Sequence, residues 1–102
     1  MNAAIAAHKA EIVKLCRDFH VRRLELFGSA SRSGFSAEES DFDFLVEFAP
    51  LARGEYATAF FGLKADLERL LGRPVDLVVA SAIRNPYFRQ SVDQSKTLLY
   101  AA

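Results

Sequence analysis

The sequence predicts a single α/β (α+β) domain in which helices pack against a small mixed β-sheet. Short runs with period-two alternation of apolar residues follow longer runs with helical spacing, as strands and helices require. The 102 residues suffice for one domain that buries about two-thirds of its unfolded surface, so residues 1–102 are assigned to one domain. With 51% hydrophobic residues and balanced charges, 13 basic and 13 acidic, the chain has a globular composition.

The first third of the chain predicts a helix followed by a strand. Residues 2–19 place apolar side chains on one side at helical spacing and charged side chains on the other. Residues 21–27 alternate Leu24 and Leu26 with charged residues, which predicts a half-buried strand that ends at Gly28.

A polar loop and a second strand are expected next. Residues 29–40 are rich in Ser, Gly and Ala and predict a loop with a possible first helical turn. Residues 41–48 alternate again, with phenylalanines on one face and both Asp41 and Asp43 on the other. The two carboxylates therefore share one side of a strand.

The second half of the chain predicts two more helices and a buried strand. Residues 56–71 carry an apolar helical stripe that stops at a glycine. Residues 74–80 form a largely apolar strand, residues 86–94 a short helix that begins at a proline, and residues 97–100 a short apolar end.

Three aspartates in these strands form the candidate catalytic and metal site. Asp41 and Asp43 point the same way with Cα atoms about 6.5 Å apart, so both can reach one ion. If the strand of residues 74–80 pairs beside the strand of residues 41–48, Asp76 adds a third carboxylate. Three such charges repel strongly without a cation, and oxygen ligands together with triphosphate oxygens suit Mg²⁺. Asp76 is also the candidate base for an acceptor hydroxyl.

The turn after the first strand is the candidate nucleotide-binding segment. Gly28 allows close approach of the backbone to a phosphate, and the Ser29 hydroxyl can donate a hydrogen bond to it. Arg32 either adds a charge-assisted bond to the same phosphate or lies exposed in the loop.

These segments resemble the minimal nucleotidyltransferase (MNT) branch of the polymerase-beta-like superfamily. The segments that carry the resemblance are Leu26-Phe27-Gly28-Ser29, Ser40-Asp41-Phe42-Asp43-Phe44-Leu45-Val46, Arg73-Pro74-Val75-Asp76-Leu77-Val78 and Arg84-Asn85-Pro86-Tyr87-Phe88. The resemblance implies a polymerase-beta-like nucleotidyltransferase fold. It also implies phosphate contacts from the Gly-Ser pair and metal binding by the three aspartates. One difference from many relatives is that Ser33 precedes Gly34 in the loop.

The resemblance further implies an activity and a partner. Members of this branch are often antitoxins that transfer AMP from ATP to a tyrosine of a HEPN-domain toxin. We therefore expect ATP as substrate, Mg²⁺ as cofactor, a HEPN toxin as partner and a cytoplasmic location. A homo-oligomer is compatible with the aromatic content and the short terminal strand.

Simpler interpretations compete with each feature taken singly. An Asp-x-Asp on a strand is usually solvated, and a Gly-Ser dipeptide alone indicates only a turn. A catalytically silent module that neutralises a partner by binding alone is the alternative function, but it gains nothing from clustered like charges. The lone Cys16 is expected to pack as an apolar residue, and neither histidine has the spacing of a zinc ligand. The balanced charge argues against direct nucleic-acid binding, and no apolar run is long enough to span a membrane.

Overall fold

A four-stranded mixed sheet lies at the centre of the computed structural model, which describes residues 2–28 and 41–102. The strands are β1 (Val21–Phe27), β2 (Phe42–Phe48), β3 (Val75–Val79) and β4 (Thr97–Ala101), and their order across the sheet is β3-β2-β1-β4. β1 pairs antiparallel with both β2 and β4, and β2 pairs parallel with β3. The predicted strand bounds are confirmed to within one residue at each end.

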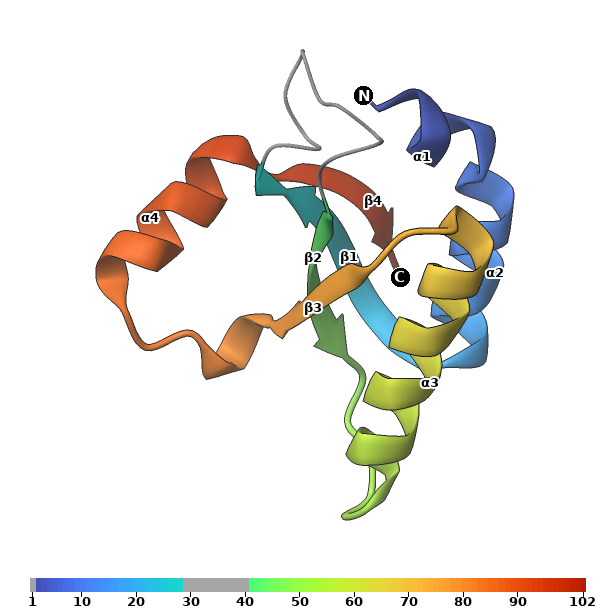
Figure 1. Ribbon diagram of the computed structural model, residues 1–102. Helices are drawn as coiled ribbons and strands as arrows, with labels where there is room; N and C mark the ends of the chain where they lie inside the picture. Colours follow the sequence, from blue (N-terminus) through green and yellow to red (C-terminus); the bar gives the residue numbers. More distant parts are fainter. Residues whose placement is uncertain (1, 29–40) are drawn as a thin grey trace.

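Helices cover the sheet from both sides (Figure 1). They are α1 (Ala3–Ala7), α2 (Lys9–Asp18), α3 (Glu55–Leu71) and α4 (Pro86–Ser95), with a short 3-10 turn, η2 (Ala80–Ala82), after β3. The helices α1, α2 and α3 pack on one face, and α4 lies on the other (Figure 1). The described helices include none that is both long and apolar enough to cross a membrane.

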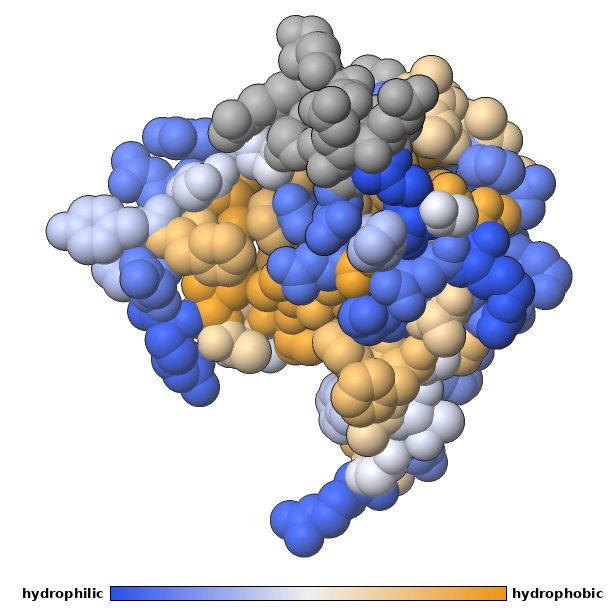
Figure 2. Space-filling view, in the orientation of Figure 1, coloured by the Kyte–Doolittle hydropathy of each residue, from blue (hydrophilic) through white to orange (hydrophobic). Residues whose placement is uncertain are grey.

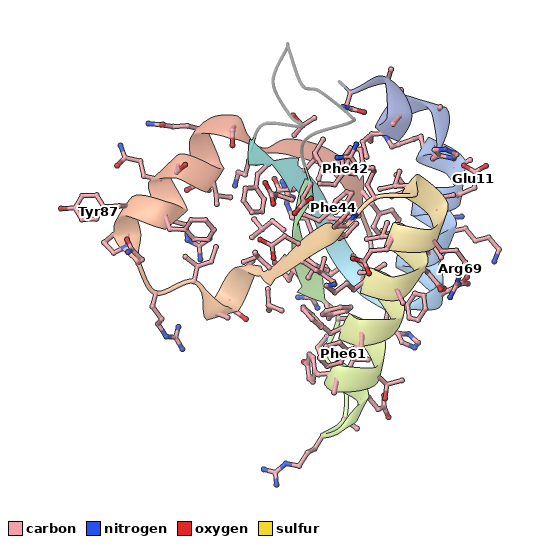
Figure 3. All side chains as sticks on the ribbon, viewed as in Figure 1. Glu11, Phe42, Phe44, Phe61, Arg69 and Tyr87 are labelled. Atoms are coloured by element: carbon pink, nitrogen blue, oxygen red, sulfur yellow. The ribbon has the colours of Figure 1, made fainter. Side chains whose placement is uncertain are left out.

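The larger core lies between the sheet and the first three helices. Alternate residues of β2, among them Phe42 and Phe44, point into it and are almost fully buried. Their rings lie 6.4 Å apart between centroids and face the inner sides of α2 and α3 (Figure 3). Cys16 is also buried there, as predicted, and burial raises the pKa of its thiol to about 12.

A smaller apolar cluster lies between α4 and the opposite face of the sheet. Phe27, Leu45 and Val92 form its buried centre, and Val78 and Ile83 are partly buried at its margin. Figure 2 shows apolar residues gathered in this region of the surface. The face of β2 that carries Asp43 therefore continues into an apolar surface below it, because Asp43 and Leu45 alternate to the same side.

Two helix predictions need correction. Residues 2–19 form two helices, because His8 has φ −110° and ψ 18° and ends α1 before α2 begins. Phe61 belongs to the apolar stripe predicted for residues 56–71, but it is 64% exposed. The stripe is instead formed by Ala59, Leu63 and Leu67, and it ends at Gly72 as predicted.

The alternation predicted for β1 is confirmed at Arg23, which is exposed, and at Leu24 and Leu26, which are buried. It is wrong at Glu25, which is only 5% exposed. Its carboxylate is paired with Arg23 Nε at 3.3 Å and lies 3.9 Å from Lys96 Nζ. Lys96 follows α4 and could not be placed beside β1 from local alternation. A buried carboxylate is tolerated here because two cations compensate it.

Candidate active site

Adjacent strands bring two of the predicted aspartates side by side. In the parallel ladder between β2 and β3, Asp43 pairs with Asp76, as expected if these two strands are neighbours. In the antiparallel ladder between β1 and β2, Phe27 pairs with Asp43, so Gly28 leaves β1 next to the same carboxylate. Asp41 lies two residues before Asp43, immediately before β2 begins.

The local sequence explains why these carboxylates face away from the core. Phe42 and Phe44 flank Asp43 and occupy the core on the opposite face, which turns Asp43 outward. The start of β3 is held in register by two hydrogen bonds. The Phe42 amide donates to the Pro74 carbonyl at 3.2 Å, and the Val75 amide donates to Glu68 Oε2 at 3.0 Å.

Gly28 makes the closest approach of backbone to the site. It has φ 72°, and a Cβ placed on it would lie 2.6 Å from Asp43 Oδ2. That is shorter than any real contact of this kind, so a side chain here would displace the carboxylate. The glycine is required for its backbone conformation and for the space beside Asp43.

Asp43 carries a raised pKa. Burial is the largest cause, and the negative charges of Asp76 and then Asp41 add to it. Asp43 is partly buried, whereas Asp41 and Asp76 are exposed. Asp76 and Asp41 are thus both close enough to act electrostatically on Asp43.

The donor set fits a hard divalent cation. All three side chains offer carboxylate oxygens, which Mg²⁺ prefers, and the repulsion at Asp43 is the kind that a cation relieves. Within residues 2–28 and 41–102, no three His, Cys, Asp or Glu side chains already converge closely enough to enclose an ion. Asp41 and Asp76 would have to turn toward Asp43, which their exposure permits, with nucleotide oxygens and water as further ligands.

Two of the predicted nucleotide-binding residues, Ser29 and Arg32, lie outside the described residues, as does the Ser33-Gly34 pair. Their roles remain predictions. Gly28, the third, is placed next to Asp43 as described above.

Sequence reasoning missed one residue of this site. Ser95, the last residue of α4, accepts a hydrogen bond from the Gly28 amide to its Oγ at 3.0 Å. The two residues are 67 positions apart, and no local pattern marks a helix-terminal serine as a partner of a distant strand end. Only knowledge that α4 packs against β1 could have suggested it.

Comparisons with known proteins agree with this geometry. The family model described as a nucleotidyltransferase domain matches residues 9–99. A protein of Methanocaldococcus jannaschii named as a candidate protein adenylyltransferase is 41% identical over 76 residues, which are 74% of each chain. The protein adenylyltransferase MntA of Thermococcus cleftensis is 38% identical over 85 residues, which are 83% of this chain and 79% of that protein.

Solved structures share the fold. One that is named as a minimal nucleotidyltransferase has a TM-score of 0.75 at 32% identity and covers 95% of each chain. A tri-AMPylated Shewanella oneidensis HEPN toxin in complex with an MNT antitoxin gives 0.65 at 25% identity, over 95% of this chain and 72% of that one. A toxin–antitoxin structure with AMP-PNP gives 0.68 at 27% identity, over 92% and 73%.

The strand order, the paired aspartates beside the Gly28 turn and the match over residues 9–99 lead to one assignment. The chain belongs to the nucleotidyltransferase domain family, in its minimal (MNT) branch.

Proposed function

We propose that this protein is a Mg²⁺-dependent adenylyltransferase that transfers AMP from ATP to a tyrosine hydroxyl of a HEPN-domain toxin and thereby acts as its antitoxin. The observation that carries the proposal is the pairing of Asp43 with Asp76 on adjacent strands, directly beside Gly28. Clustered carboxylates next to a glycine turn suit a metal-bound triphosphate better than they suit a surface used only for binding.

Each residue has a role in this proposal. Asp41 and Asp43 would hold the metal, and Asp76 would share in holding it or accept the proton of the acceptor hydroxyl. Gly28 would let the backbone approach the phosphates, with Ser29 and Arg32 as predicted donors to them. Bound Mg²⁺ would neutralise charge on the triphosphate and on the reacting phosphorus.

The proposed transfer forms one bond to phosphorus and breaks one. The tyrosine oxygen forms a bond to the α-phosphorus of ATP, and the bond between that phosphorus and the bridging α–β oxygen breaks. The electron pair leaves with pyrophosphate, and the hydroxyl proton passes to Asp76 or to water. The products are AMP-tyrosine on the partner and free pyrophosphate.

Similar proteins support the nucleotide and the partner. The relatives named as protein adenylyltransferases are 38% and 41% identical to this chain. One structural neighbour is a complex between an AMPylated HEPN toxin and an MNT antitoxin, and another contains AMP-PNP.

The experiment incubates the purified protein with ATP, Mg²⁺ and a HEPN-domain protein from the same organism, and locates any modification by mass spectrometry of the partner. We expect AMP on a tyrosine, loss of the modification with EDTA, and loss of it in the Asp41→Asn Asp43→Asn double variant. Tyrosine-to-phenylalanine replacement at the modified position of the partner should also abolish it. A stable complex that never acquires AMP would contradict the proposal and favour neutralisation by binding alone.

A further inference from the structure

We infer that Ser95 is a positioning residue for nucleotide binding: its hydroxyl holds the Gly28 amide and so fixes the glycine turn beside Asp43. The inference rests on the proposed function, because it assigns Ser95 a role in presenting that turn to a nucleoside triphosphate. It concerns a residue of α4 that is remote in sequence from the three aspartates and from Gly28.

The hydroxyl of Ser95 is oriented to accept. Its Oγ lies 3.3 Å from the Ser91 carbonyl and 3.5 Å from the Val92 carbonyl, so its proton is directed back into α4. A lone pair of the same oxygen then faces the Gly28 amide, which donates to it at 3.0 Å. The serine therefore links the last turn of α4 to the end of β1.

The helix that carries Ser95 is itself held against β1 at both ends. Near its start, the Phe88 ring meets the Phe27 ring edge-to-face, with centroids 6.0 Å apart and planes at 77°. In the middle of α4, Val92 is buried and only 1% exposed. Immediately after the helix, Lys96 Nζ lies 3.9 Å from the Glu25 carboxylate of β1. Because α4 is anchored on either side of Ser95, the serine is a fixed point and not a mobile side chain.

The hydrogen bond from the Gly28 amide to Ser95 constrains the Gly28 backbone. This residue has a left-handed backbone, and the space at its Cα faces Asp43 Oδ2. A shift of the Gly28 peptide would change both the orientation of this backbone and the room beside the Asp43 carboxylate. Removal of the Ser95 hydroxyl is thus expected to weaken nucleotide binding while α4 stays packed.

The test compares three variants. Ser95→Ala removes the acceptor, Ser95→Thr retains it, and Ser91→Ala removes an exposed hydroxyl one turn earlier on the same helix as a matched control. Two quantities are measured for each: the Kd for α,β-methylene ATP with Mg²⁺, and the hydrogen-exchange rate of the Gly28 amide in the protein without nucleotide. KM for ATP and kcat of AMP transfer to the HEPN partner are measured in parallel.

We expect Ser95→Ala to raise the Kd and the KM for ATP about three- to tenfold, the range of one net hydrogen bond, with kcat changed less. Exchange of the Gly28 amide should accelerate, and Ser95→Thr and Ser91→Ala should match the wild type in every readout. A purely structural role would instead lower Tm without separating KM from kcat.

Two results would overturn the inference: unchanged nucleotide affinity in Ser95→Ala, or a Gly28 amide that exchanges equally fast in both proteins. Failure of the proposed function is a separate result. If the wild type binds the analogue but transfers no AMP, the proposed function fails, whereas weaker binding by Ser95→Ala still supports the positioning role. A wild-type protein that binds no nucleotide would refute both.

Discussion

Asp43 is the residue where the demands of folding conflict with the metal-binding role that we propose for it. Its carboxylate is partly buried and faces two other negative charges, and these raise its pKa. A raised pKa means that the folded chain binds the proton more readily than the unfolded chain does. The ionised carboxylate therefore costs stability above the raised pKa, and the metal-free protein regains that stability as the pH falls through it.

Replacement of this carboxylate should accordingly stabilise the metal-free fold and abolish activity. We expect Asp43→Asn to have a higher Tm than the wild type at neutral pH without metal, and AMP transfer reduced about a hundredfold or more. Thermal unfolding between neutral and acidic pH should show the advantage of the variant shrinking as Asp43 of the wild type takes up its proton.

A suitable control is Asp18→Asn, which removes an exposed aspartate that pairs with Lys14 at 3.0 Å on α2. An exposed pair of this kind contributes at most about 1 kcal/mol, so this variant should be slightly less stable and fully active. An Asp43→Asn protein that is less stable than the wild type, or that still transfers AMP at the normal rate, would contradict the role given to Asp43.

Substitution of Gly28 should have two distinct effects, one on stability through its backbone conformation and one on activity through the space beside Asp43. Gly28→Ala should lower the free energy of unfolding by about 1–2 kcal/mol through its left-handed φ. It should also impair AMP transfer, because the added Cβ would displace the Asp43 carboxylate. Chemical denaturation and transfer kinetics together measure the two effects.

Gly72→Ala is the matched control for this substitution. Gly72 has nearly the same φ, 68° against 72°, but no atom lies within 4 Å of the position of its Cβ. The Gly72→Ala variant should therefore lose about as much stability as Gly28→Ala and keep its AMP-transfer activity. Equal loss of activity in both variants would show that strain alone, and not the space beside Asp43, accounts for the effect.

At the level of elements, the contact between α3 and β3 sets the position of Asp76. Glu68 near the end of α3 accepts the Val75 amide at 3.0 Å, one residue before Asp76. This backbone hydrogen bond is the main cause of the lowered pKa of Glu68, and Lys64 at 3.2 Å contributes further. A lowered carboxylate pKa adds stability that is present above the ordinary Glu value and is lost as the pH falls through the lowered pKa.

Glu68→Gln should therefore be less stable than the wild type at neutral pH, and the difference should diminish in acid. Urea denaturation at a series of pH values measures this directly. Glu47→Gln, in which an exposed partner of Arg22 at 3.5 Å is neutralised, should show little change at any pH. A constant difference between Glu68→Gln and the wild type from neutral to acidic pH would contradict the role of the ionised form.

Most helices and strands were predicted correctly because residues within each segment mark where it begins, ends or alternates. Alternation marked β1 and β2, Gly72 marked the end of α3, and Pro86 marked the start of α4. The break at His8 escaped prediction, because the apolar spacing continues across it while the backbone there leaves the helical conformation.

Part of the candidate site was also predictable from local sequence patterns. The spacing of Asp41 and Asp43 follows from strand geometry, and their meeting with Asp76 required only the assumption that β3 lies beside β2. The contacts of α4 with β1 were not predictable, since Ser95 and Lys96 find Gly28 and Glu25 through the folded topology and not through spacing.

For the molecule as a whole, the sheet separates the larger buried core from the face that carries the candidate site. The first three helices and one face of the sheet enclose the larger core. The other face carries Asp43 and Asp76, Gly28 beside Asp43, and the apolar cluster beside α4 (Figure 2). In the proposed function, this face presents a nucleotide to a HEPN toxin, which supplies the acceptor.

The most direct measurement of this claim uses ATP labelled at the α- or at the γ-phosphate, with Mg²⁺ and the HEPN protein. We predict label on the partner from α-labelled ATP only, and none from either nucleotide when the Asp41→Asn Asp43→Asn variant replaces the wild type. Label transferred from γ-labelled ATP, or no label from either nucleotide despite a stable complex, would contradict nucleotidyl transfer by this site.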